Sequence, residues 1–328
     1  MNSNRYYLKD YFNKTDIFKD SNSYVIDNEN KTSYFLDLDC GKGNIISYHV
    51  FNGIDLQFNS FNSLNCNQLR FTPDEDLIVI NHCNKGRYEC RVQGDILLYL
   101  GEGELAASIS SIDYDISEFP LGYYEGLEIS FDCKVAQKSL DEFIGVGEIN
   151  LSELFNKLKE NGGFVIVGAK DEINHIIGEI YEVDDNINEV YFKLKIVEFL
   201  IFLLKLEIGD TNTNKNHCSL KHVTIVKRIK NYLIDNLDTN ITLNDLSNRY
   251  GISKTSIKNC FKEVYGKSIF QWRKEYRLQV AANLLISSDK SIKEISTEIG
   301  YKNHSKFSSA FKEYFELTPS SYRSLKNN

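Results

Sequence analysis

Two segments near the end of the chain carry lysine, asparagine, serine and threonine at helical spacing. Once their apolar positions are set aside, the side chains left over are Lys254, Thr255, Ser256, Lys258, Asn259 and Lys262 in the first segment and His304, Ser305, Lys306, Ser308, Ser309 and Lys312 in the second. Lysine can bind guanine O6 and N7, asparagine can bind adenine N6 and N7, and threonine can contact a thymine methyl group. These residue types therefore predict contacts to a nucleic-acid duplex.

Local signals predict the elements that position the first segment. Thr242 to Asp245 resembles a capping box at the start of a short helix, Gly251 supplies a turn, and Ser253 can cap the helix that follows. In that second helix the spacing i, i+3, i+4, i+7 turns four residues inward: Ile257, Cys260, Phe261 and Val264. The pattern is helix, glycine turn, capped helix.

The same pattern returns 49–50 residues later. Ser291 to Glu294 matches the capping box, Gly300 makes the turn, and Asn303 caps a helix whose inward residues are Phe307, Ala310, Phe311 and Tyr314. Between the copies, 270–286 reads as one long helix. Two tandem helix-turn-helix units are predicted, and in such units the second helix enters the DNA major groove. We call these second helices the reading helices.

Charge is distributed unevenly between the two parts of the chain. Residues 221–328 contain 19 Lys and Arg against 10 Asp and Glu, a net charge of +9, whereas residues 1–220 contain 19 against 36, a net charge of −17. Such asymmetry indicates a basic module for a polyanion joined to an acidic module with another role. The alternative for the basic side chains is that they form merely solvated faces.

From these patterns we assign individual roles on DNA. Side chains near the start of each reading helix are expected to contact bases: Thr255, Ser256, Lys258, Asn259, His304, Ser305, Lys306 and Ser309. Others are expected to bind phosphates, which gives affinity and register without sequence choice: Lys254, Lys262, Arg273, Lys302 and Lys312.

Residues 1–135 read as short strands separated by turn residues at intervals of roughly ten. One hairpin is predicted at Asn84-Lys85-Gly86, between the apolar runs 77–80 and 88–92. This rhythm favours a β-sandwich or barrel. With the helices that follow, the predicted fold class is an α+β multi-domain protein with an all-α C-terminal part.

Residues 136–210 switch to helical spacing and are predicted to contain a dimerisation helix. The segment 190–206 is apolar nearly all round, which means burial on more than one side. The expected dimer residues are Val190, Leu194, Val197, Leu200, Ile201 and Leu204. An internal core helix is the competing interpretation, with nearly equal weight. Residues 211–220 are the predicted linker, because 210–216 lack any apolar residue.

The stretch from Thr224 to Arg323 resembles the DNA-binding domain of AraC/XylS-type bacterial transcription regulators. The matching residues are Leu243–Leu246, Gly251-Ile252-Ser253, Phe261-Lys262, Gly266, Arg277-Leu278, Ala281, Leu284-Leu285, Ile295, Gly300-Tyr301, Phe307-Ser308, Phe311-Lys312 and Thr318-Pro319. The resemblance covers about a third of the chain and implies a promoter-binding domain at 221–328. It usually implies activation, with RNA polymerase as a further partner. Lys306 and Ser309 depart from the aromatic residue and the arginine common at these positions, so the target sequence does not carry over.

The N-terminal part resembles the cupin-type sensor domain joined to many such regulators. The resemblance is carried by 81–90 and 119–126. The resemblance does not identify an effector. If the domain binds a small ligand, its interior is the default pocket, and the candidate ligand-binding residues are Arg87, Tyr123 and Tyr124. Control by a protein partner without a small ligand is a further possibility.

Enzymatic and metal chemistry are less well supported by the sequence. The alternative to a regulator is an enzyme with a cupin-like catalytic domain fused to a DNA-binding module, but the β-domain has only His49 and His82 and no His-x-His. His82-Cys83 with Cys90, and His217-Cys218 with His222, lack a paired Cys-x-x-Cys. We expect no catalytic residues, cofactor or metal, no membrane contact, a cytoplasmic location with reduced thiols, and a homodimer.

Overall fold

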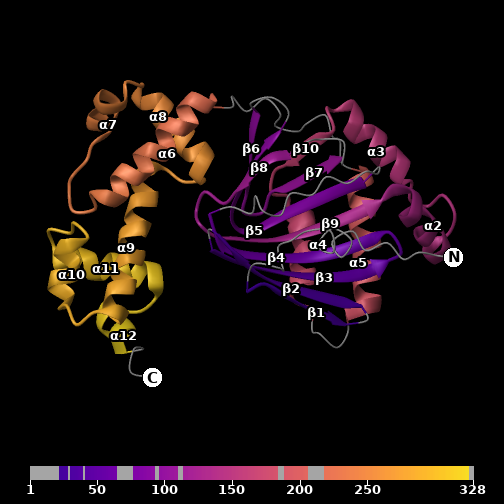
Figure 1. The fold of residues 1–328 in the computed structure, drawn as a ribbon, viewed down its shortest axis with the longest axis horizontal. Helices are drawn as coiled ribbons and strands as arrows, with labels where there is room; N and C mark the ends of the chain where they lie inside the picture. Colours follow the sequence, from indigo (N-terminus) through magenta and orange to yellow (C-terminus); the bar gives the residue numbers. More distant parts are fainter. Residues whose placement is uncertain are drawn as a thin grey trace. The chain divides into compact units, whose positions relative to one another are not determined.

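The computed structural model describes residues 22–28, 30–39, 41–64, 77–92, 96–109, 114–183, 188–205 and 218–324. The chain folds into two compact units, Met1–His217 and Cys218–Asn328. The first unit is mixed α/β and the second is helical (Figure 1). Most of the linker predicted at 211–220 lies outside the described residues.

The first unit is built on an antiparallel sheet with the strand order β1-β2-β3-β4-β9-β5-β7-β10. The strands are β1 (Tyr24–Asn28), β2 (Lys31–Leu38), β3 (Gly41–Phe51), β4 (Ile54–Ser63), β5 (Leu77–Val92), β6 (Ile96–Gly101), β7 (Leu105–Ile109), β8 (Tyr114–Glu118), β9 (Tyr124–Asp132) and β10 (Phe164–Val167). Among the described strands, β1 and β10 end this order without pairing with each other, so the sheet is open. The cupin-like barrel is therefore not confirmed.

The hairpin predicted at Asn84-Lys85-Gly86 is wrong, because these residues lie inside one 16-residue strand, β5. The first half of β5 pairs with β9 and β7, and its second half pairs with β6 and β8. The turn residues are absorbed as an irregularity between Cys83 and Lys85, followed by Gly86 at φ 88°. Pairing with β9 continues through Lys85 and Gly86, so the chain stays extended through a segment that local preference alone would bend.

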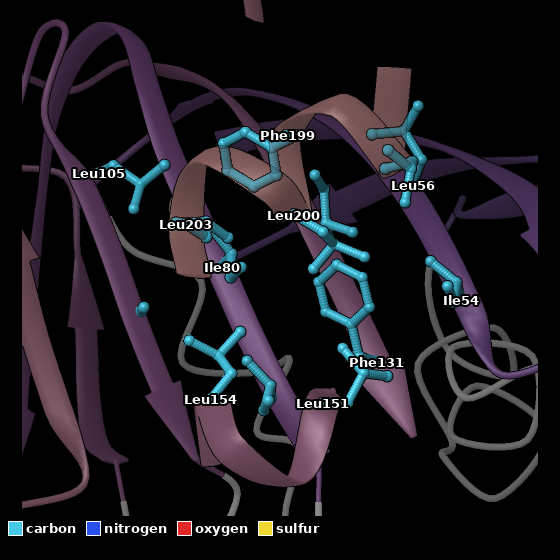
Figure 2. Packing of buried hydrophobic residues seen from close by; sticks show 14 of the residues in the cluster. Ile54, Leu56, Ile80, Leu105, Phe131, Leu151, Leu154, Phe199, Leu200 and Leu203 are labelled. Carbon is cyan, nitrogen blue, oxygen red and sulfur yellow. The ribbon is translucent and has the colours of Figure 1, made fainter. Parts of the chain in front are cut away.

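Within the described ranges, four helices accompany the sheet: α2 (Cys133–Ile144), α3 (Leu151–Glu160), α4 (Asp171–Tyr181) and α5 (Asn188–Lys205). The region 136–210, predicted to be helical, also supplies β10, which pairs with β7 at the edge of the sheet. Figure 2 shows how the larger core forms: Leu151 and Leu154 of α3 and Phe199, Leu200 and Leu203 of α5 gather around Ile54, Leu56, Ile80, Leu105 and Phe131 of the strands.

Helix α5 has one buried side and one exposed side. Leu200 is 0% exposed within its own unit, so its assignment to a dimer interface is wrong. Val197 and Leu204 also pack partly against this core. The exposed apolar residues of α5 among those expected to dimerise are Val190 at 63%, Leu194 at 55% and Ile201 at 41%. The helix thus divides its apolar residues between a core and an uncovered stripe.

The second unit consists of α6 (Leu220–Asp235), α7 (Leu243–Tyr250), α8 (Lys254–Tyr265), α9 (Ile269–Ser287), α10 (Ile292–Glu298), α11 (His304–Phe315) and α12 (Pro319–Ser324). The C-terminal half of α9 packs with α10 and α11 through Leu278, Leu285, Ile295, Phe307 and Phe311. Near the start of α9, Trp272 contacts Phe261 of α8. The long connecting helix therefore belongs to the cores on both sides of it. No helix among the described residues is long and apolar enough to cross a membrane.

Candidate nucleic-acid interface

The entry to the first reading helix, α8, is fixed by three local hydrogen-bonding devices. Thr242 and Asp245 form a reciprocal capping box at the start of α7. Ser247 Oγ, on α7, donates to the carbonyl oxygen of Ile252 at 2.7 Å and holds the turn that follows Gly251. Ser253 then caps α8 by accepting from the backbone N–H of Ser256. Satisfied helix ends of this kind define where a helix begins and in which direction it points.

The second helix-turn-helix unit repeats each of these three hydrogen-bonding arrangements. Ser291 and Glu294 form the capping box of α10. Ser296 Oγ donates to the carbonyl oxygen of Tyr301 at 3.5 Å, and Asn303 caps α11 by accepting from the N–H of Lys306. One position differs: α8 ends at Gly266 in the left-handed conformation, whereas Glu316 takes that conformation after α11 at φ 60°. The predicted internal repeat is therefore a repeat of structure.

Each reading helix buries one side and exposes the other. In α8 the residues predicted to face inward are all buried, as are Phe307 and Phe311 of α11. The inward assignment of Tyr314 is wrong, because this side chain is 38% exposed; its hydroxyl accepts from Gln279 Nε2 at 3.1 Å. Because each helix buries this side against its neighbours, its opposite side is exposed and accessible to a ligand.

Most of the predicted DNA-contacting residues lie on the free side of these helices. Those that are exposed are Lys254, Thr255, Lys258, Asn259, Lys262, Lys302, Ser305, Lys306, Ser309 and Lys312. Ser256 and His304 are half-buried and also serve the local structure, since Ser256 Oγ is 2.9 Å from Ser253 Oγ and His304 Nδ1 is 2.9 Å from Ser296 Oγ. The structure brings the predicted residues together as two polar helix faces.

Arg273 is the exception, and its assignment to a phosphate is wrong. The side chain is 7% exposed and donates to the backbone carbonyl oxygens of Asn236 and Thr239. Burial, and secondarily the charge of Arg277, lower the pKa of the Arg273 guanidinium to about 10. Arg273 therefore supports the segment after α6. Arg277, whose role no sequence pattern predicts, binds the same segment.

In the first unit, the three candidate ligand residues lie on neighbouring segments, because Gly86, next to Arg87, pairs with Tyr124, but their surroundings differ. Tyr124 is 4% exposed and stacks on Phe119 in a packed aromatic cluster, so it is a core residue. Arg87 is half-buried, with its guanidinium 5.4 Å from the centre of the Tyr99 ring. Tyr123 is half-buried in the turn before β9.

The histidine and cysteine groups considered for metal binding have other surroundings. His82 is buried, its Nε2 is 3.2 Å from Asn174 Oδ1, and burial lowers its pKa. Burial raises the pKa of the Cys83 thiol to about 12, which disfavours the thiolate that binds metals. Within the described ranges, no group of three or more His, Cys, Asp or Glu is placed to hold a metal ion. His217 lies outside those ranges.

Comparison with known proteins identifies the same region. Residues 246–324 match the model of the HTH_18 family, described as a helix-turn-helix domain. The Transposon Tn10 TetD protein of Escherichia coli is 32% identical over 102 residues, which are 31% of this chain and 74% of that protein. The HTH-type transcriptional regulator ExsA of Pseudomonas aeruginosa is 38% identical over 85 residues, which are 26% of this chain and 31% of ExsA.

A third relative, YtdP of Bacillus subtilis, is named as an uncharacterized HTH-type transcriptional regulator. It is 26% identical over 162 residues, which are 48% of this chain and 21% of YtdP. The chain thus matches less than a third of YtdP and of ExsA.

Lys258 offers the sharpest test of base contact, because it is exposed one turn into α8. Lys258→Ala should weaken binding to the protein's own DNA site by about 1–3 kcal/mol and relax the base preference at one position. Titrations against duplexes that vary at each position would measure both effects. The control is Lys221→Ala on α6, outside both helix-turn-helix units, which should leave base preference unchanged. An equal loss on every duplex would make Lys258 a phosphate contact.

Proposed function

Because this chain belongs to the AraC/XylS family of transcription regulators, we propose that it binds specific promoter DNA through α8 and α11 and regulates transcription there. Activation is the outcome usual for such proteins, and RNA polymerase is then a second partner. The first unit senses an effector and forms a homodimer, and the protein acts in the cytoplasm.

One observation carries the DNA-binding proposal. The two reading helices begin from matching capped turns and leave polar and basic residues exposed on the side opposite their buried faces. The connecting helix α9 has 19 residues, which corresponds to about 28 Å at 1.5 Å per residue. Successive major grooves on one side of DNA lie about 34 Å apart, so a helix of this length suits two neighbouring contacts.

The relatives favour a regulator over the alternative of an enzyme fused to DNA-binding helices. YtdP and ExsA are both named as transcriptional regulators. The proposal gives no residue a catalytic role.

The sensing proposal is supported by two polar rows on the sheet of the first unit. One row runs through Ser47, Gln57, Glu128 and Asn81, and the adjacent row through His49, Asp55 and Ser130, with Val79 between Ser130 and Ser108. They point away from the face where Leu56, Ile80 and Ile129 meet the helices, because successive side chains of a strand alternate between faces. We call these two rows the polar face.

The polar face is largely buried, and although His49 Nδ1 lies 2.9 Å from Asp55 Oδ1 and Ser108 donates to the Val79 carbonyl oxygen at 3.4 Å, one of its hydroxyl groups is left for a ligand. Asp55, Gln57, Ser108 and Ser130 are each at most 5% exposed, and among the described residues the hydroxyl of Ser130 has no hydrogen-bond partner. Buried polar groups are costly unless they are hydrogen-bonded. These rows contain carboxyl, amide and hydroxyl groups and the imidazole of His49, but no lysine or arginine. A small polar effector without negative charge fits this chemistry.

The dimer proposal is supported by the uncovered stripe of α5. Val190, Leu194 and Ile201 lie on one side of the helix and are exposed. A second copy of the chain is the expected occupant, because a two-fold axis lets one apolar stripe cover its own counterpart. Exposed apolar surface of this kind marks an interaction site.

Selection of duplexes from a random library by the full chain tests the DNA-binding proposal. We expect an enriched site with two blocks about 10 base pairs apart, centre to centre, and an affinity that falls as salt rises. The absence of any preferred duplex at moderate salt would overturn the proposal.

The carboxyl group of Glu128 predicts a pH dependence for the first unit. Burial raises its pKa to about 7, against a smaller lowering effect of the hydrogen bond from Asn81. The folded state therefore keeps a proton that the unfolded state releases near the ordinary pKa. This contribution lowers stability as pH rises from the ordinary carboxyl value to about 7 and is constant above it. The total loss is about 3 kcal/mol at most.

Glu128→Gln should remove that contribution. Relative to the parent, the variant gains stability between pH 5 and pH 8, as measured by urea unfolding of the first unit. Glu125→Gln is the control, because Glu125 lies on the same strand in an exposed ion pair with Lys85, and it should show little such change. A parallel pH profile for the parent and Glu128→Gln would contradict a buried, protonated carboxyl.

Leu194→Asp should weaken the homodimer, because a buried unpaired carboxylate in the interface is costly. Light scattering is expected to show a mass that shifts toward the monomer. Val146→Asp introduces the same charge at a residue that is 87% exposed in the loop between α2 and α3, and the mass should stay unchanged. If Leu194→Asp also leaves the mass unchanged, α5 is not the interface.

A further inference from the structure

The loop between α6 and α7 is held by two arginines of α9. Arg273 donates to the carbonyl oxygen of Asn236 at 3.0 Å and to that of Thr239. Arg277, one turn later, donates to the carbonyl oxygen of Leu237 and to that of Thr239 at 3.3 Å. Guanidinium groups satisfy unpaired carbonyl oxygens at the end of a helix and suit the negative end of its dipole. The connecting helix is thus anchored to the beginning of the first helix-turn-helix unit.

The turn of the second helix-turn-helix unit packs closely against the same loop. Gly300 has φ 82°, and a Cβ atom on it would lie 2.6 Å from the carbonyl oxygen of Leu237, 2.9 Å from Cα of Asp238 and 2.8 Å from Nη2 of Arg277. Backbone from the two helix-turn-helix units therefore meets at this point with no room for a methyl group. We call the loop 236–239 together with Arg273, Arg277 and Gly300 the junction.

The equivalent turn of the first helix-turn-helix unit shows that the close approach is specific to the second helix-turn-helix unit. Gly251 also has a positive φ, 66°, but a Cβ atom on it would meet nothing within 4 Å. Both positions need a left-handed backbone, which favours glycine. Only Gly300 in addition needs to lack a side chain, because another part of the fold is pressed against it.

Two further contacts of α9 complete the connection to the second reading helix. Lys274 Nζ is 3.0 Å from Glu313 Oε2, and the hydroxyl of Tyr314 accepts from Gln279 Nε2 at 3.1 Å. Both partners belong to α11. The path from α8 through α9 to α11 is therefore fixed by packing at each end and by the junction between them.

We propose that Arg277 and Gly300 are positioning residues that set the distance and rotation between the two reading helices, so that one chain reads both halves of its DNA site at a single fixed spacing. This rests on the proposed function, since it concerns how the same two helices use DNA. Two linked contacts reinforce each other only when their geometry matches the two sites. Neither residue needs to touch DNA for this role.

The test compares Gly300→Ala with its matched control Gly251→Ala in the full chain. Both substitutions place alanine at a positive φ, but only the first adds a methyl group at the junction. Binding is measured on the selected duplex, on the same duplex with one half scrambled, and on one with a base pair inserted between the halves. Circular dichroism establishes that each variant is folded.

For the parent and for Gly251→Ala, the inserted base pair should weaken binding at least about tenfold. For Gly300→Ala, binding to the intact duplex should fall by at least about tenfold, while binding to the half-scrambled duplex stays within about twofold of the parent. The penalty for the insertion should then shrink. A general loss of folding would instead weaken binding to all three duplexes alike.

If Gly300→Ala does not fold, Arg277→Ala provides the same test, because it removes the bonds to Leu237 and Thr239 without adding an atom. A folded variant that keeps the parent's full penalty for the insertion would overturn the inference. So would a parent that binds its duplex but tolerates the insertion, and in that case the proposed function would stand. A parent that prefers no duplex would overturn the proposed function itself.

Discussion

The second unit depends on the requirement that each reading helix bury one side against its neighbours. Ile257, Phe261 and Val264 in α8, like Phe307 and Phe311 in α11, are completely enclosed. Once these aromatic and aliphatic side chains are in place, the rotation of each helix about its own axis is decided, and so is the set of residues that faces outward. Lys258 and Asn259 are exposed because Ile257, Cys260 and Phe261 are not. The polar surface is a consequence of the core.

Features specified by neighbours in sequence could be predicted well. The sequence predicts both capping boxes, both turn glycines and the N-caps Ser253 and Asn303, because each depends on residues within one or two helical turns. The features that were missed depend on distant partners. In the sequence, Arg273 cannot be distinguished from an exposed basic residue. In the structure, α9 lies beside the loop after α6, and the Arg273 guanidinium group donates to backbone carbonyl oxygens of that loop.

The difference between local and distant partners also explains why some predictions for the first unit are wrong. Asn84-Lys85-Gly86 has the composition of a turn, but pairing with β9 continues through Lys85 and Gly86, and β7 and β6 pair with β5 before and after this segment. The four residues of β10 are too few to show a period, and they pair with β7, more than 50 positions earlier in the chain. For α5 the sequence shows apolar residues on all sides. Only the packing of Phe199, Leu200 and Leu203 reveals which of them the core takes.

The close approach at Gly300 also limits how freely such a protein can be re-engineered. Residues on the free side of α8 or α11 are exchangeable in principle, since they touch little else. A whole helix-turn-helix unit is not exchangeable, because the turn at Gly300 packs closely against the 236–239 loop before the other helix-turn-helix unit. A chimaera that imports α10 and α11 from a relative would have to import the matching 236–239 loop and Arg277 as well. The two helix-turn-helix units repeat one structure, but their contact at Gly300 makes each depend on the other.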